Sequence, residues 1–291
     1  MTTQTREYFA PGSVDDALRV LSERPRAHLL AGGTDLLNDL RHGVIEPGDV
    51  VDLAGVAELG GLDEAPDGVR IGATVTMREL LAAPLGDRLR ALREAADLLG
   101  GRQIQAAATV GGNLCQGSPA AEVATALLAH GALVDVAGPR GRRTMPVAEL
   151  FAGPRRTTLA PEEILVAIRV GVADAGWSSA YRRIDLRRSV DIAIVSASAA
   201  LDIDAGVVRS ARVAVGAARP VPFLVPEAAA ALEGVAVGDE AALAAAAGRA
   251  AEAARSASSP ITDVRAGAEY RRAMVGVVVE RAVRAAVEEG R

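Results

Sequence analysis

The spacing of hydrophobic residues in the first 170 positions predicts helices that alternate with short strands. Val14, Ala17 and Leu21 recur at helical spacing after Ser13, a suitable N-cap residue, so a helix is expected over 14–22. The same periodicities predict strands at 28–31, 50–53, 69–71, 132–137 and 164–170, helices at 34–40, 76–81, 87–99, 121–128 and 147–150, and a loop at 155–160. Alternation of this kind favours an α/β layer.

The second part of the chain has a different pattern, which begins after an expected boundary at 171–176. Three strands are expected first, at 179–184, 192–203 and 207–215. Asp204, Ala205 and Gly206 join the last two strands and form a suitable hairpin turn. Helices are expected afterwards at 227–232, 240–257 and 268–287. These segments predict a small antiparallel sheet of three strands packed on helices, so the fold class is α+β.

Composition excludes several classes of function. Aromatic residues make up 2% of the 291 residues, the net charge is -5 and the pI is about 5.4. These values argue against nucleic-acid binding, which depends on a basic face and on aromatic stacking. All 32 basic residues are arginine. A Schiff-base lysine and a P-loop lysine are therefore excluded.

The sequence also does not support a metal-binding or a membrane-spanning protein. Cys115 is the only cysteine, and the three histidines do not show metal-ligand spacing, so we expect no metal site, disulfide or cluster in this chain. Cys115 itself is expected to be buried and inert. The longest apolar runs, such as 274–279, are too short to span a bilayer, and no signal peptide is visible. We therefore expect a cytoplasmic protein.

Two glycine-rich turns are the candidates for chemistry. The first lies at 30–36 and the second at 109–114, each after an expected strand or extended segment. Paired glycines let successive backbone N–H groups close on an anion and form a phosphate nest. A single Gly-Gly turn is more often only a structural loop. Two in one lysine-free chain suggest a diphosphate held mainly by backbone. The Gly-x-Gly-x-x-Gly fingerprint is missing, which disfavours a Rossmann site.

Both turns resemble the diphosphate loops of one family, the FAD-binding medium subunits of molybdenum hydroxylases, which include xanthine and carbon monoxide dehydrogenases. The resemblance rests on Ala-Gly-Gly-Thr-Asp-Leu at 31–36 and on Thr-Val-Gly-Gly-Asn at 109–113. It continues at 118–122, 156–165, 181–193 and 270–272, in the expected order over nearly the whole chain. The sequence is therefore similar to this family throughout.

The resemblance implies a fold and a cofactor. It implies a two-lobed, vanillyl-alcohol-oxidase-like (PCMH-type) FAD-binding domain over 1–172, with subdomains at 1–55 and 56–172. A C-terminal domain of the carbon monoxide dehydrogenase flavoprotein type would occupy 176–291. FAD would lie extended between the lobes, with its diphosphate on the backbone of residues 31–35 and 111–113.

Several side chains acquire expected roles from the same resemblance. Glu122 stands where the family usually places an aspartate that holds the adenosine part, although a lone glutamate here is more often a surface acid. Arg182 or Arg183 stands where relatives place a lysine near the flavin, and Ser189 to Asp191 match a loop that approaches the isoalloxazine. The residues expected to contact FAD are Leu30, Ala31, Gly32, Gly33, Thr34, Asp35, Leu36, Leu99, Thr109, Gly111, Gly112, Asn113, Ser118, Glu122, Leu165, Arg182 and Asp191.

The implied function is electron transfer without substrate activation. Electrons would enter at a large molybdopterin subunit and pass through iron–sulfur clusters on a small subunit to FAD. They would then leave to NAD, quinone or oxygen. We expect no catalytic side chain in this chain. We expect the assembly to be a dimer of heterotrimers. Two alternatives stay open: a stand-alone FAD-dependent oxidase or dehydrogenase that acts directly on a small organic substrate, and a cofactor-free interaction subunit.

Overall fold

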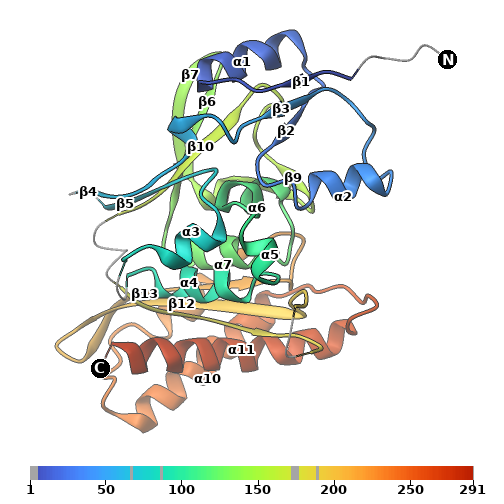
Figure 1. Ribbon diagram of the computed structural model, residues 1–291. Helices are drawn as coiled ribbons and strands as arrows, with labels where there is room; N and C mark the ends of the chain where they lie inside the picture. The colour runs from blue at the N-terminus through green and yellow to red at the C-terminus, as the bar shows by residue number, and fades with distance from the viewer. Residues whose placement is uncertain (1–5, 66–67, 86–87, 172–176, 188–189, 291) are drawn as a thin grey trace.

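The computed structural model describes residues 6–65, 68–85, 88–171, 177–187 and 190–290. The described residues form four sheets, one of which is a two-stranded hairpin. Figure 1 shows helices between the larger sheets and below the last of them. The small sheet near the N-terminus lies at one end. Helices α10 and α11 lie at the opposite end, beneath the C-terminal sheet.

The N-terminal sheet is a small parallel α/β unit, as the sequence predicts. Ser13 caps helix α1, because its hydroxyl accepts from the Asp16 N–H at 3.0 Å. The strand order is β1-β3-β2, and both pairs are parallel. The elements are β1 (Tyr8–Phe9), α1 (Val14–Glu23), β2 (His28–Leu30), α2 (Leu36–Arg41), β3 (Val50–Asp52) and the 3-10 turn η1 (Ala57–Leu59). Strand β1 was not expected from the sequence.

The middle sheet is antiparallel and has five strands in the order β4-β5-β10-β6-β7. Its central strand β10 is covered on both faces. Ile164 and Val166 pack with α1 and β3, whereas Ile168 and Val170 pack under the helices that follow β5. The elements are β4 (Leu62–Ala65), β5 (Gly68–Gly72), β6 (Leu133–Gly138), β7 (Gly141–Pro146), η2 (Val147–Glu149) and β10 (Ile164–Gly171).

The helices of the middle part lie between this sheet and the C-terminal sheet (Figure 1). Every residue of α7 is buried, which its run of alanine and leucine permits. The elements are α3 (Met77–Ala82), α4 (Arg90–Leu98), α5 (Arg102–Gln105), α6 (Val110–Gln116) and α7 (Glu122–Ala129), with a small hairpin of β8 (Phe151–Gly153) and β9 (Arg156–Thr157). The helix expected over 87–99 therefore begins at Arg90, and Asp87 lies outside the described residues.

The C-terminal sheet has helices on both faces. Helices α4 and α7 pack on one face, and α11 packs on the other, with α10 against α11. The turn at Ala205 and Gly206 has φ of 49° and 76°, so the predicted hairpin is present. The elements are β11 (Ser178–Ile184), β12 (Val195–Asp204), β13 (Val207–Gly216), β14 (Phe223–Leu224), α9 (Pro226–Ala230), α10 (Glu240–Ala257) and α11 (Ala268–Glu289).

Three expectations from the sequence are wrong in detail. The C-terminal sheet has four strands and not three, because Phe223 and Leu224 pair with β13 after a turn that contains Pro220 and Pro222. The loop expected at 155–160 contributes β9 to the β8–β9 hairpin. The strand expected over 192–203 begins at Val195, because the preceding residues close a loop. Most of the expected boundary, 172–176, lies outside the described residues.

Candidate FAD-binding cleft

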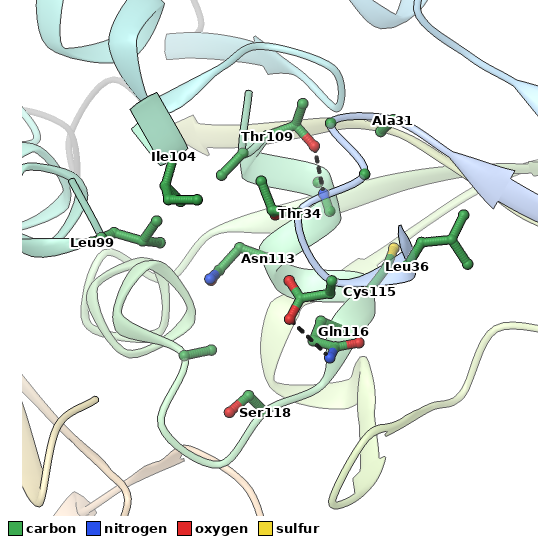
Figure 2. A pocket seen from close by; sticks show the side chains of 18 of the residues that line it. Ala31, Thr34, Leu36, Leu99, Ile104, Thr109, Asn113, Cys115, Gln116 and Ser118 are labelled. Carbon is green, nitrogen blue, oxygen red and sulfur yellow. Dashed lines mark hydrogen bonds between the residues drawn. The ribbon is translucent and has the colours of Figure 1, made fainter. Parts of the chain in front are cut away.

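One cleft of about 920 Å³ brings the two glycine-rich segments together (Figure 2). Its volume lies in the range of cofactor pockets. In Figure 2, Leu99 and Ile104 lie at one end, Leu36 and Cys115 at the other, and Thr34 and Asn113 between them. The predicted site residues that line it are Ala31, Gly32, Gly33, Thr34, Asp35, Leu36, Leu99, Thr109, Gly111, Gly112, Asn113, Ser118, Glu122, Leu165 and Asp191.

The first glycine loop requires its glycines for backbone reasons. Gly33 has a φ of 71°, a conformation that residues with a side chain rarely adopt. A Cβ on Gly32 would lie 1.7 Å from the Ala107 carbonyl oxygen, so the loop at 106–108 touches it directly. The first intrahelical donor here is the Leu37 N–H, which bonds to the Gly33 carbonyl at 3.1 Å. The N–H groups before it have no intrahelical partner, as an anion-binding turn requires.

The second glycine segment is the first turn of helix α6, and this changes its expected role. The Gly111 N–H donates to the Ala73 carbonyl at 2.9 Å, and the Gly112 N–H donates to the Thr109 hydroxyl at 3.0 Å. A phosphate nest made of these two N–H groups is therefore not formed, contrary to the expectation from the sequence. A Cβ on Gly111 would lie 2.7 Å from the Ala73 oxygen, so this glycine allows close packing against the preceding strand.

The polar groups that this segment offers to the cleft are side chains. Asn113 and Ser118 lie along the cleft in Figure 2. Asn113 Oδ1 is buried and has no hydrogen-bond partner among the described residues, although a buried amide oxygen is normally satisfied. The Thr109 hydroxyl accepts from Gly112 and can still donate. These groups suit a ligand with phosphate and hydroxyl oxygens, so the cleft fits the diphosphate and sugar parts of FAD.

The end of the cleft near α2 is acidic and is crossed by an ion pair. Burial, with a smaller contribution from Asp39, raises the pKa of Asp35 despite the opposing Arg155. Gln116 donates to Asp35 at 3.2 Å. Arg155, which follows β8, forms an ion pair with Asp39 of α2 and so links the two walls. Sequence reasoning did not name Arg155 or Gln116, although Arg155 directly precedes the segment that carried part of the resemblance.

Glu122 belongs to a buried ionic cluster at the first turn of α7. Arg183 Nη1 lies 3.1 Å from its Oε1, and Arg183 Nε lies 2.9 Å from Asp185 Oδ2. Burial raises the pKa of Glu122 to about 7, and the attraction of Arg183 offsets this only in part. Glu122 is therefore a wall residue of the cleft and not the surface acid that a lone glutamate would suggest.

Two predicted site residues do not line the cleft. Successive residues of a strand point to opposite faces, so Arg183 and Arg182 leave β11 on opposite sides, with Arg183 toward Glu122 of α7. Arg182 Nη1 bonds to Glu94 Oε2 at 2.8 Å. Leu30 is likewise not among the residues that line the cleft, whereas its neighbour Leu29 is. Of the pair Arg182 and Arg183, the second is the one that meets the cleft wall.

The loop after β11 forms part of the cleft wall and is held together by Asp191. The Asp191 carboxylate accepts from the Leu186 N–H at 3.1 Å and from its neighbour Ile192 at 2.9 Å. Val190 lies beside Gly101, where a Cβ would be 3.4 Å from its Cγ2. Ser189 lies outside the described residues. The loop thus packs on the connection between α4 and α5.

Cys115 differs from its expected placement. Its side chain is exposed and lines the cleft, so the expectation of a buried side chain is wrong. The cleft nevertheless encloses the thiol closely enough that desolvation raises its pKa to about 12. A thiol that stays protonated at neutral pH is a poor nucleophile, which agrees with the expected inertness.

The described residues show no group of three or more histidine, cysteine, aspartate or glutamate side chains that could hold a metal ion. Within the same residues, no helix is long and apolar enough to cross a membrane.

Comparisons with known proteins agree with the geometry of the cleft. Residues 3–172 match the family described as the FAD binding domain in molybdopterin dehydrogenase, and residues 179–286 match the CO dehydrogenase flavoprotein C-terminal domain. The chain belongs to the family of FAD-binding subunits of molybdenum hydroxylases. It is therefore an FAD-binding subunit of an oxidoreductase, and bound FAD supplies the electron-transfer chemistry.

Relatives support membership of this family over most of the chain. The xanthine dehydrogenase FAD-binding subunit of Escherichia coli O157:H7 is 36% identical over 219 residues, which cover 74% of this chain and 75% of the relative. The carbon monoxide dehydrogenase medium chain of Hydrogenophaga pseudoflava is 33% identical over 282 residues, covering 96% of each. A solved structure of carbon monoxide dehydrogenase from that organism has a chain that superposes with a TM-score of 0.91 at 33% identity, covering 99% of both chains.

Proposed function

We propose that this chain passes electrons from iron–sulfur clusters on a small partner subunit, through FAD, to an external acceptor such as NAD, quinone or oxygen. The observation that carries the proposal is the cleft of about 920 Å³ that both glycine segments line, with the buried and unpartnered Asn113 Oδ1 on its wall. A large molybdopterin subunit would activate the substrate. The complete assembly would be a dimer of heterotrimers.

The substrate is chosen elsewhere in this proposal. Two relatives carry the names of xanthine and carbon monoxide dehydrogenases, whose substrates have little in common. A fold shared by such different enzymes cannot itself select the substrate. The described residues of this chain also contain no metal-ligand group. The chain's own task is to bind FAD, orient it and exclude water from it.

One end of the cleft supports a proposal for where the small subunit docks. Near Leu99 and Ile104, several large apolar side chains are exposed: Leu98, Ile104, Leu186, Val190 and Ile192. Ile104, Val190 and Ile192 also line the cleft. An apolar patch of this kind on a soluble surface commonly marks a protein interface. A partner seated there would bring its clusters to the flavin and cover the mouth of the cleft.

The first test is made on the purified full chain. It should bind one FAD per chain, and acid precipitation should release all of the flavin, because Cys115 is held protonated and the first loop contains no histidine or cysteine. Yellow colour that stays in the acid pellet would contradict non-covalent binding. A colourless protein that takes up no added FAD would support the cofactor-free interaction subunit.

The second test separates the electron-transfer subunit from the stand-alone flavoenzyme. The chain alone should not hydroxylate purines, aldehydes or N-heterocycles, but its reduced flavin should pass electrons to an artificial dye. Co-expression with the small and large subunits should restore substrate oxidation. Efficient oxidation of an organic substrate by the isolated, metal-free chain would instead favour the stand-alone enzyme.

A further inference from the structure

Helix α2 forms part of one wall of the cleft without a buried side chain of its own. It has six residues, Leu36–Arg41, and none of them is buried. Its N-cap residue Asp35 and its own Asp39 both line the cleft. A helix this short is not stable by its own propensity, so its position depends on contacts with the rest of the protein. The contacts that α2 makes across the cleft are therefore important for this wall.

Two side-chain contacts join α2 and its N-cap to the opposite wall. Gln116, at the end of α6, donates to Asp35 Oδ1 at 3.2 Å. Arg155, in the turn between β8 and β9, forms an ion pair with Asp39. Figure 1 shows α2 beside β9. The Asp39 side chain is 15% exposed, so water and salt weaken this ion pair less than one between two fully exposed groups.

The backbone of Arg155 is held in a conformation that few residues with a side chain adopt. Its φ is 57°, in the left-handed region. The Arg155 N–H donates to the Gly117 carbonyl at 2.8 Å, and a Cβ on Gly117 would lie 3.0 Å from the Arg156 nitrogen. The turn is thus packed against the end of α6. Unfavourable backbone conformations that the surroundings maintain are often found at functional sites, and this turn carries the side chain that reaches Asp39.

Two acids face one cation at this end of the cleft. Burial and Asp39 raise the pKa of Asp35, whereas Arg155 lowers it, so the three charged groups lie close together. The other arginine among the described lining residues, Arg187, lies 3.9 Å from Asp191 in the loop after β11. The diphosphate of FAD is negatively charged. If Asp39 acted on FAD through its charge alone, it would repel the cofactor and weaken its binding.

We propose that the Asp39–Arg155 ion pair is a clasp that fixes α2 against the β8–β9 turn and so holds FAD in the cleft. Both are positioning residues: they act through the wall of the cleft and need not touch the cofactor. A wall that is already fixed loses less conformational freedom when FAD binds, which favours the bound state and slows dissociation. The clasp acts on FAD binding, and the identity of the electron acceptor does not affect it.

The clasp predicts the same effect from the removal of either charge. Asp39→Asn and Arg155→Asn should each raise the dissociation rate of FAD about three- to fivefold at low salt, as expected for a partly exposed ion pair. The double variant should release FAD no faster than either single variant, because all three lose the same contact. Asparagine is chosen at position 155 because it tolerates the left-handed backbone. Arg155→Lys keeps the charge and should remain close to the wild type.

The experiment uses the full chain loaded with FAD. Flavin stoichiometry and circular dichroism are recorded first for every variant. Dissociation is then followed after dilution as the rise in free-flavin fluorescence, at low and at high salt. Hydrogen exchange of residues 33–44 in the loaded protein reports how firmly α2 is held. Glu64→Gln and Arg88→Gln are the controls, because this ion pair is more exposed, has an N–O distance of 2.7 Å, and neither residue lines the cleft.

In Asp39→Asn and Arg155→Asn, we expect faster release of FAD and faster exchange at 33–44, and both differences should shrink at high salt. The two control variants should match the wild type. Slower release from Asp39→Asn would overturn the proposal, and so would a double variant in which the two single effects multiply, because each charge would then act on FAD by itself. If Arg155→Asn takes up no FAD, an unchanged rate in Asp39→Asn overturns it equally. A wild type that binds no FAD would refute FAD binding together with the clasp.

Discussion

At the scale of single residues, Gly32 and Gly33 are neighbours that the fold requires for different reasons. Gly33 needs its left-handed backbone conformation, whereas Gly32 needs the absence of a side chain where the Ala107 carbonyl approaches. The sequence suggested that the paired glycines make space for a diphosphate. The structure adds that they make space for the protein itself.

Substitution of these glycines should separate the two requirements. Gly33→Ala should lower the free energy of unfolding by about 1–2 kcal/mol, the cost of a left-handed alanine, and should weaken FAD binding. Gly32→Ala should destabilise the chain more, because a backbone oxygen must move. Gly12→Ala is the control, since no atom lies within 4 Å of its added Cβ. Urea unfolding and flavin fluorescence titration measure both effects, and equal stability of all three variants would contradict the argument.

Glu122 should make the stability of the FAD-free chain depend on pH. Its pKa is raised by burial from 4.5 in the unfolded chain to about 7 in the folded chain. The folded state therefore binds more protons, and stability is lost as pH rises from about 4.5 to 7. Glu122→Gln mimics the protonated form, so at pH 8 it should be more stable than the wild type by up to about 3 kcal/mol.

The comparison of the two proteins at pH 4 is the internal control for that prediction. Glu122 is then protonated in both the folded and the unfolded wild type, so the difference from Glu122→Gln should vanish. A difference in the free energy of unfolding that is the same at pH 4 and pH 8 would show that burial does not raise the pKa of this acid.

At the scale of elements, the formation of helix α6 depends on its N-cap more than on its composition. Two glycines in its first turn disfavour a helix. The Thr109 hydroxyl compensates by accepting from the Gly112 N–H, and the Gly111 N–H bonds to Ala73 on the neighbouring segment. Thr109 also lines the cleft, so we propose that one residue both starts the helix and contacts the cofactor.

Thr109→Val should therefore affect stability and binding together. Loss of the cap should lower the free energy of unfolding by about 1 kcal/mol, and loss of the hydroxyl should weaken FAD binding. Thr109→Ser keeps the hydroxyl and is the matched control, which should retain both properties. Thermal unfolding and flavin titration give the two readouts. A Thr109→Val protein with wild-type FAD affinity would show that this hydroxyl does not contact the cofactor.

At the scale of the whole molecule, the two parts of the chain share a hydrophobic core. Tyr181, Ala200 and Ala214 of the C-terminal sheet are buried in the same cluster as Leu92 of α4 and Leu127 of α7. The inner face of this sheet is thus covered by helices from the FAD-binding part. Burial of apolar surface on this scale couples the folding of the two parts.

Separation of the two parts should expose that face. A fragment of residues 177–291 produced alone should aggregate or bind a hydrophobic dye, whereas the full chain should unfold in one transition. Co-expression of residues 1–176 with the fragment should recover part of the soluble complex. Two separate unfolding transitions in the full chain, or a stable monomeric fragment, would contradict a shared core.

The sequence by itself determined most of the elements and located the two glycine segments that line the cleft. Hydrophobic periodicity located the long helices and the strands of the C-terminal hairpin, because burial on one face requires a regular spacing that neighbouring residues reveal. The paired glycines and the motifs around them indicated the family. Short strands such as β1, β8 and β14 were not predicted, because two or three residues are too few to show a hydrophobic periodicity.

Only the tertiary structure decided how the site is built. Whether Arg182 or Arg183 meets the cleft depends on which face of β11 is turned toward α7, and strand alternation alone leaves both choices open. The N–H groups of α6 are taken by partners distant in sequence, such as Ala73. The raised pKa of Glu122 comes from burial against other segments. Each outcome depends on contacts between residues far apart along the chain, which a local pattern of residues does not contain.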